Sequence, residues 1–152
     1  MNTKPFLVSF ALDGRRYALY LSVVERVIRI VEITPLPRAP DIVTGVINVQ
    51  GRVIPVVDIR KRFGLPLREI TLTDQLIIAR ASKRPVAMVV DTVHDVIEYH
   101  ESMLVPAEEI VPETRYIDGV VKLKDGMVLI HDLDKFLSLE ERRSLGRAMA
   151  ET

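Results

Sequence analysis

Residues 45–64 read GVINVQGRVIPVVDIRKRFG, and this stretch carries the most complete local signal in the chain. Its first five residues and Arg52–Val57 are rich in Val and Ile, which is typical of strands, and Gln50-Gly51 between them predicts a tight turn. Asp58 can cap a short helical turn that Gly64 ends. The stretch therefore predicts a β-hairpin followed by one turn of helix.

The same pattern occurs again in the second half of the chain. Residues 119–136 repeat the apolar run, the glycine turn and the aspartate at offsets of 73 to 75, and residues 17–28 are echoed by 86–97 at an offset of 69. Such matches between small apolar residues can arise by chance, but two blocks in the same order favour two similar subdomains. Because halves of about 65 residues are marginal alone, we expect 6–64 and 74–137 to share one core, with exchange of strands between them allowed.

The remaining segments predict a mainly β chain. Strands are expected at 6–12 and 15–21 around an Asp-Gly turn, and at 75–81, 86–90, 119–124 and 127–130. The pattern Ser-x-x-Glu at Ser22 predicts a short helix over 22–28, Asp91 can cap the element after it, and the same pattern at Ser138 predicts a C-terminal helix over about 139–150. Short strands with turns every 8 to 12 residues favour small barrels over an α/β sheet.

The composition excludes several classes of protein. The 152 residues include 21 Lys and Arg against 21 Asp and Glu, and this balance argues against a nucleic-acid binder. There is no cysteine, which fits a reducing cytosol and excludes thiol chemistry. No apolar run approaches the ~18 residues of a membrane span, and residues 1–5 lack the long apolar stretch of a signal peptide. We therefore expect a cytoplasmic chain with no nucleic-acid partner and no direct membrane insertion.

The sequence offers little support for catalysis. His94, His100 and His131 lack the spacing of a helical zinc motif, and no nucleotide-binding loop or nucleophile elbow is found. Asp58 and Asp132 occupy matched positions of the repeat, which favours a shared capping role over a catalytic one. One enzyme alternative is a small hydrolase that uses His131 and Asp132. We expect no catalytic residue, no metal and no cofactor, and therefore a binding module.

The segment from Pro35-x-Pro37-x-x-Pro40 through residues 45–64 resembles the signature of CheW-like domains. These domains are the coupling proteins of bacterial chemosensory arrays and also form the regulatory module of the CheA kinase. The resemblance runs from about Phe6 to Leu137, so the chain is similar to a single free-standing CheW-like domain over 1–152 and not to the kinase. Shorter matches are Tyr17-Ala18-Leu19, Thr34-Pro35-Leu36-Pro37, Val89-Val90-Asp91-x-Val93 and Tyr116-Ile117-x-Gly119.

The resemblance implies a fold of two five-stranded SH3-like β-barrels packed around a common core. It implies a scaffold that joins chemoreceptor cytoplasmic tips to a CheA-type histidine kinase, with one barrel on the kinase regulatory domain and the receptor hairpin in the groove between barrels. The positions carried over from the family's receptor-facing groove are Val24, Arg26, Gly45, Gln50, Leu76 and Ala87. Val24 and Leu76 could instead be core, and Gly45 could only relieve a tight turn. A divergent adaptor in surface motility or second-messenger control is the alternative function.

Two of these positions depart from the family pattern. The family usually has Asn-Leu-Arg-Gly where this chain has Asn48-Val49-Gln50-Gly51, and often Arg-Glu where it has Glu25-Arg26. If the side chains of Arg26 and Gln50 meet, the usual ion pair is replaced by at most one charge-assisted hydrogen bond. The exchange either preserves local polarity or alters the choice of partner, because charge at a rim sets specificity more than affinity.

Overall fold

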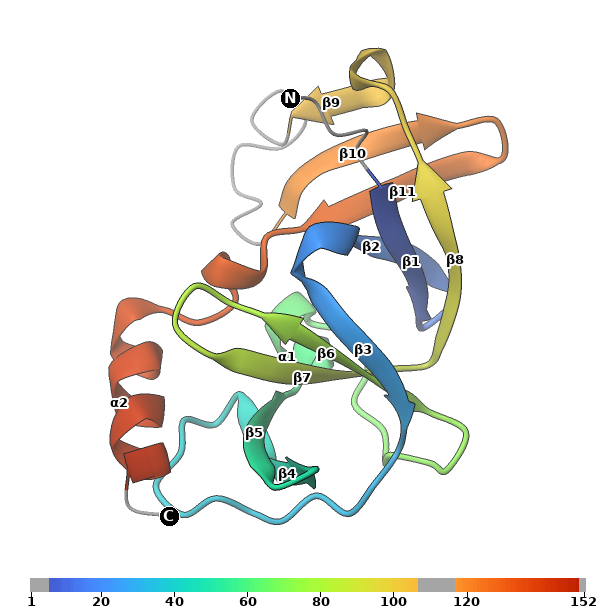
Figure 1. The fold of residues 1–152 in the computed structure, drawn as a ribbon. Helices are drawn as coiled ribbons and strands as arrows, with labels where there is room; N and C mark the ends of the chain where they lie inside the picture. Colours follow the sequence, from blue (N-terminus) through green and yellow to red (C-terminus); the bar gives the residue numbers. More distant parts are fainter. Residues whose placement is uncertain (1–5, 107–116, 151–152) are drawn as a thin grey trace.

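The computed structural model describes residues 6–106 and 117–150, whose strands form two curved sheets (Figure 1). The first sheet has six strands in the order β8 (Thr92–Glu98), β1 (Phe6–Leu12), β2 (Arg15–Tyr20), β11 (Gly126–His131), β10 (Ile117–Leu123) and β9 (Leu104–Pro106). The second has five, in the order β3 (Val24–Arg29), β6 (Gln75–Arg80), β7 (Pro85–Val90), β5 (Arg52–Val57) and β4 (Val43–Val49). The helical elements are η1 (Leu21–Val23), α1 (Ile59–Phe63), η2 (Glu101–Met103), η4 (Leu133–Lys135) and α2 (Leu139–Ala150). The mainly β class with a C-terminal helix is confirmed, whereas closure of each sheet into a barrel stays a prediction.

Each sheet takes strands from both of the expected halves of the chain. The first combines β1 and β2 with β8–β11, and the second combines β3–β5 with β6 and β7. The chain crosses between sheets after β2 and again after β7, so the segments 6–64 and 74–137 do not correspond to separate sheets. The first sheet has one strand more than expected because β9 adds to β10.

The internal repeat extends to the pairing register. Val27 pairs with Ile77 in the second sheet, and the residues 69 positions away pair in the first sheet as Val96 with Val8. The two parallel contacts also correspond, since Val56 is opposite Ala87 and Ile130 is opposite Ala18. The β4–β5 and β10–β11 hairpins each carry a register shift at the same place, immediately before Gly45 in one and Gly119 in the other. The sequence repeat therefore reflects a repeated backbone arrangement.

The stretch 45–64 folds as its residues predict. Gln50 and Gly51 have φ values of 53° and 86°, as a two-residue hairpin turn between right-twisted strands requires. The Asp58 carboxylate accepts hydrogen bonds from the backbone N–H groups of Arg60 and Lys61, at 3.0 and 3.2 Å. Gly64 ends α1 in the left-handed region with φ 68°.

Two local predictions are wrong. The expected helix over 22–28 is a single 3-10 turn followed by strand β3, which pairs with β6. The β-branched residues of this segment fit a sheet, and a full ladder of backbone hydrogen bonds outweighs one capping contact. Asp91 precedes strand β8 and caps no helix; its carboxylate accepts from the backbone of Asp13 and the side chains of Arg60 and Arg68.

One large core joins the two sheets. Its buried residues come from β1 and β2 of the first sheet, from β6 and β7 of the second, and from α1 and α2. Two smaller clusters lie within the individual sheets. The large cluster accounts for the stability of a chain whose halves are marginal alone, because its apolar area is buried only when both sheets are present.

Candidate functional site

The six residues assigned to the receptor-facing surface all belong to the second sheet. Four strands and one turn supply them: Val24 and Arg26 from β3, Gly45 from β4, Gln50 from the β4–β5 turn, Leu76 from β6 and Ala87 from β7. The backbone pairing brings these strands into one neighbourhood, since β3 is adjacent to β6 and β7 lies between β6 and β5. Their exposure differs, however: Arg26 and Gln50 are exposed, Val24 is half-buried, and Gly45, Leu76 and Ala87 are buried.

Arg26 and Gln50 form the exposed polar contact of this surface. The Arg26 guanidinium donates to the Gln50 side-chain oxygen at 3.3 Å, so the two side chains meet as one hydrogen bond with one charged partner. Beside it, Arg52 pairs with Glu25 at 3.1 Å. These contacts connect edge strand β3 to the β4–β5 turn at Gln50 and to the first residue of β5 at Arg52, so the two edges of the second sheet approach each other at this end.

A bulge in β3 explains why two consecutive side chains, Glu25 and Arg26, both reach the β4–β5 hairpin. Val24 is opposite Ala79 and Arg26 is opposite Ile78, which leaves Glu25 as the extra residue. Glu25 also lies 4.0 Å from the side chain of Arg80. Its carboxylate is therefore engaged by other arginines, and within the described part of the chain Arg26 has Gln50 in place of a carboxylate partner.

Glycine is required at position 45 by a close approach of two backbones and not by a tight turn. It lies inside β4, where a Cβ would fall 2.3 Å from the backbone oxygen of Thr34. Thr34 and Val46 exchange backbone hydrogen bonds of 2.9 and 2.8 Å, so the two backbones must approach closely. Gly119 repeats this feature against Val105, with a Cβ distance of 3.0 Å.

Leu76 and Ala87 do not line a surface. Both are 0% exposed and belong to the small core of the second sheet, together with Ile47 and Ile54. Their assignment to a partner-facing groove is therefore wrong, because a fully buried side chain cannot touch a docked protein. Ala87→Trp would overpack this core, at a cost of about 1–3 kcal/mol, and cannot serve as a surface probe. Val24 is half-buried and packs against the large core.

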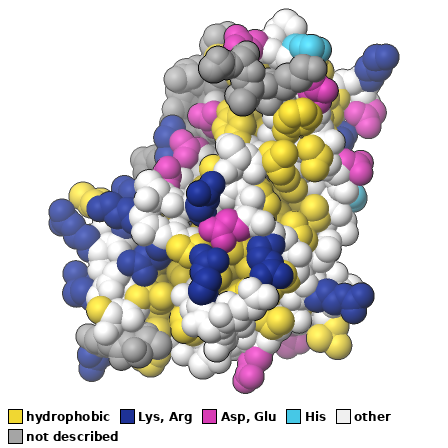
Figure 2. Space-filling view, in the orientation of Figure 1, with side chains coloured by type: hydrophobic (Ala, Val, Ile, Leu, Met, Phe, Trp, Pro, Cys, Tyr) yellow, Lys and Arg dark blue, Asp and Glu magenta, His cyan; other side chains and the backbone are white. Residues whose placement is uncertain are grey.

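Sequence reasoning did not identify several exposed apolar side chains that lie outside the Arg26–Gln50 contact. Val27 on β3 is 37% exposed, and its repeat partner Val96 on β8 is 57% exposed. Leu21 and Phe6 are also partly exposed. Figure 2 shows hydrophobic side chains gathered in a stripe on this face, in the region of β1 and β8. The sequence offered one sign of these exposed positions, namely that Val27 and Val96 occupy matched positions in the repeat. Alternation along a strand could not reveal them, because it does not show which face of an edge strand is covered.

The hydrolase alternative fails at His131. Its ring is 1% exposed, and within the described residues neither ring nitrogen has a hydrogen-bond partner. Asp132 is the N-cap of η4 and accepts from the backbone N–H of Asp134 at 3.1 Å. The two side chains therefore form no acid–base pair.

Across residues 6–106 and 117–150 no group of three or more His, Asp or Glu side chains could hold a metal ion. No described helix is long and apolar enough to cross a membrane.

The sequence and the fold match those of known proteins. The sequence model of the CheW-like domain matches residues 7–141, and the chain belongs to this family. It is 33% identical to the chemotaxis protein CheW of Bacillus subtilis, over 95% of this chain and 94% of that protein. Identity to the CheW of Rhizobium meliloti is 29%, over 91% and 90% of the two chains. The crystal structure of the scaffolding protein TtCheW from Thermoanaerobacter tengcongensis superposes with a TM-score of 0.83 at 30% identity, covering 91% and 96% of the two chains.

Proposed function

We propose that this chain is a non-enzymatic adaptor of bacterial chemotaxis that couples chemoreceptors to a CheA-type histidine kinase. The observation that carries the proposal is the family match over residues 7–141. It is supported by relatives named chemotaxis protein CheW that align over most of their length, and by a structural neighbour described as a scaffolding protein. Membership of this family makes the chain an adaptor and not an enzyme. No observation favours a role in a non-chemotactic pathway.

The receptor tip is proposed to bind the exposed surface around Arg26 and Gln50. This surface carries the Arg26–Gln50 hydrogen bond and the Glu25–Arg52 ion pair, and exposed polar groups of this kind are typical of the rim of a protein interface. The kinase regulatory domain is proposed to dock on a separate surface, so that one molecule holds both partners. We place the complex in the cytoplasm, at the membrane only through its receptors.

A double-mutant cycle on binding to a receptor cytoplasmic fragment tests the role of Arg26 and Gln50. Gln50→Arg replaces the oxygen that accepts from Arg26 with a second cation in its neighbourhood and should weaken the native complex. Arg26→Glu with Gln50→Arg restores the ion pair common in the family and should recover stability while shifting preference toward receptors of ordinary coupling proteins. The coupling energy between the two changes should be about 0.5–3 kcal/mol.

Lys124→Gln is the control, because this exposed turn residue on the first sheet changes the charge by one unit away from the surface. Its binding should equal that of the native chain. Additive effects at positions 26 and 50, with unchanged receptor binding in every variant, would remove these two residues from the receptor surface. Binding to the kinase regulatory domain, measured on the same variants, would still report on the adaptor function.

A further inference from the structure

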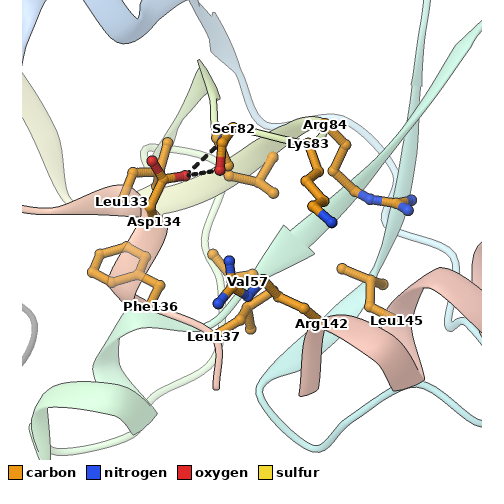
Figure 3. A pocket seen from close by; sticks show the side chains of 12 residues that line it. Val57, Ser82, Lys83, Arg84, Leu133, Asp134, Phe136, Leu137, Arg142 and Leu145 are labelled. Atoms are coloured by element: carbon orange, nitrogen blue, oxygen red, sulfur yellow. Dashed lines mark hydrogen bonds between the residues drawn. The ribbon is translucent and has the colours of Figure 1, made fainter. Parts of the chain in front are cut away.

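A small cavity lies between the β6–β7 turn, η4 and α2 (Figure 3). These three elements lie on the opposite side of the molecule from β8 (Figure 1). Its volume is about 60 Å³. The larger apolar side chains that line it are Val57, Val86, Leu133, Phe136, Leu137 and Leu145. An apolar recess with a few polar groups at its mouth is the usual form of a ligand site.

The cavity exists because the two repeats fill equivalent positions differently. In the first sheet, His131 packs against Tyr17 and Phe10, with ring centroids 4.7 and 5.9 Å apart. The counterparts of these three residues at offsets of 69 and 74 are much smaller, namely Val57, Val86 and Ala79. Val57 and Val86 line the cavity directly. Space that aromatic rings occupy in one repeat is therefore left open in the other.

Positive charge surrounds the mouth of this cavity. Lys83 and Arg84 extend from the β6–β7 turn, and Arg142 reaches toward the cavity from α2 (Figure 3). Among the described residues none of the three forms an ion pair. The one carboxylate at the cavity, Asp134, already accepts from the backbone N–H and the hydroxyl of Ser82, at 2.6 and 2.9 Å. Asp134 keeps its negative charge, so the lining carries three cations, Lys83, Arg84 and Arg142, against one carboxylate and is positive in balance.

We propose that this cavity binds a small branched aliphatic carboxylate of about five carbons. An apolar cavity of about 150 Å³ takes a benzene molecule, so one of about 60 Å³ suits an isopropyl group and excludes a large ring. The carboxylate then lies at the mouth and accepts charge-assisted hydrogen bonds from Lys83 and Arg142, which come from two different elements. Such a ligand would connect the β6–β7 turn to α2. The site is separate from the Arg26–Gln50 surface and does not rest on the proposed function.

Titration of the ¹⁵N-labelled chain with 3-methylbutanoate, followed by amide chemical shifts, tests the site. Amides of Ala81–Val86, Leu133–Leu137 and the first two turns of α2 should shift together, with a Kd on the order of 1 mM, as expected for so small a ligand. The neutral isostere 3-methylbutanamide tests the charge, and acetate tests the apolar group. Each should bind about tenfold more weakly than 3-methylbutanoate, because the amide lacks the negative charge and acetate lacks the branched apolar group.

Matched variants locate the binding. Lys83→Gln with Arg142→Gln should weaken binding of 3-methylbutanoate by about tenfold or more, whereas Arg143→Gln, an exposed change on α2 outside the cavity, should leave it unchanged. Val86→Phe fills the cavity with a ring like that of its counterpart Tyr17 and should abolish binding in a folded chain. Four outcomes would each overturn the proposal. They are equal binding of acid and amide, shifts outside these segments, no shifts at about 20 mM of the acid, and full binding by the Lys83 and Arg142 double variant.

Discussion

His131 is the least ordinary side chain of the core. It lies among the rings of Phe63, Tyr17 and Phe136, with centroid distances of 4.3, 4.7 and 5.6 Å. Burial in this apolar setting lowers the pKa of His131 to about 3, because the charged ring would lose its hydration without gaining a partner. The folded chain therefore keeps this ring neutral under conditions in which the unfolded chain protonates it.

The sign of the resulting pH effect follows from the two states. The folded pKa lies below the unfolded value of about 6.5, so the unfolded state binds more protons as the pH falls. This residue alone should reduce the free energy of unfolding by about 1.4 kcal/mol per pH unit between about pH 6 and pH 4. His131→Phe removes this pH-dependent loss, so the free energy of unfolding of the variant should rise relative to that of the native chain as the pH falls. Urea unfolding of both chains at several pH values measures the difference, and parallel pH profiles would contradict it.

At the residue scale, the sequence predicted contacts better than it predicted exposure. The comparison of Arg26 and Gln50 with the family pattern anticipated a single hydrogen bond in place of an ion pair, which the 3.3 Å contact confirms. Leu76 and Ala87 were assigned to a surface although both are fully buried. Burial depends on which strands cover each face of the sheet, and this information is not local to either residue.

At the element scale, α1 shows how much of a short helix depends on its ends. The helix has only five residues, which is too short to be stable by propagation alone. Its start is held by the Asp58 carboxylate, and its end by backbone hydrogen bonds from Gly64 and Leu65 to the last turn. Capping and packing on the large core therefore determine whether α1 forms.

Asp58→Ala should lower the free energy of unfolding by about 1 kcal/mol, within a range of about 0.5–2, because two backbone donors lose their acceptor. Asp41→Ala is the matched control. It removes the same charge beside the same helix, but the Asp41 side chain is 96% exposed and only pairs with Lys61 at 3.5 Å. Its effect should stay within about 0.5 kcal/mol. Equal losses in thermal or urea unfolding would show that charge, and not the cap, matters at this position.

The two Ser-x-x-Glu patterns show where local signals suffice. Ser138 and Glu141 form the full reciprocal cap, with hydrogen bonds of 2.8 and 3.0 Å, and α2 begins as predicted. The same pattern at Ser22 leads into a strand, because the segment after it pairs with β6. A capping pattern predicts a helix only where no neighbouring strand competes for the backbone, and that competition involves residues about 50 positions away.

At the scale of the whole molecule, the exchange of strands makes the two sheets dependent on each other. The crossing after β7 is held by Asp91, whose carboxylate accepts from Arg60 at 2.7 Å and from the backbone N–H of Asp13 at 2.8 Å. Asp91 thus connects the β1–β2 turn of the first sheet to α1, which follows the second sheet. The repeat was visible in the sequence, but the partner of each edge strand was not, because equivalent strands are chemically alike and could pair in either sheet.

The central claim is that this chain joins a receptor to a kinase, and reconstitution of the three components tests it most directly. Kinase autophosphorylation is measured with a receptor cytoplasmic fragment and a CheA-type kinase, with and without the chain. We predict strong stimulation only when all three are present, and its reduction in Gln50→Arg but not in Lys124→Gln. Kinase activity that is unchanged by the chain, together with no binding to either partner, would contradict the account.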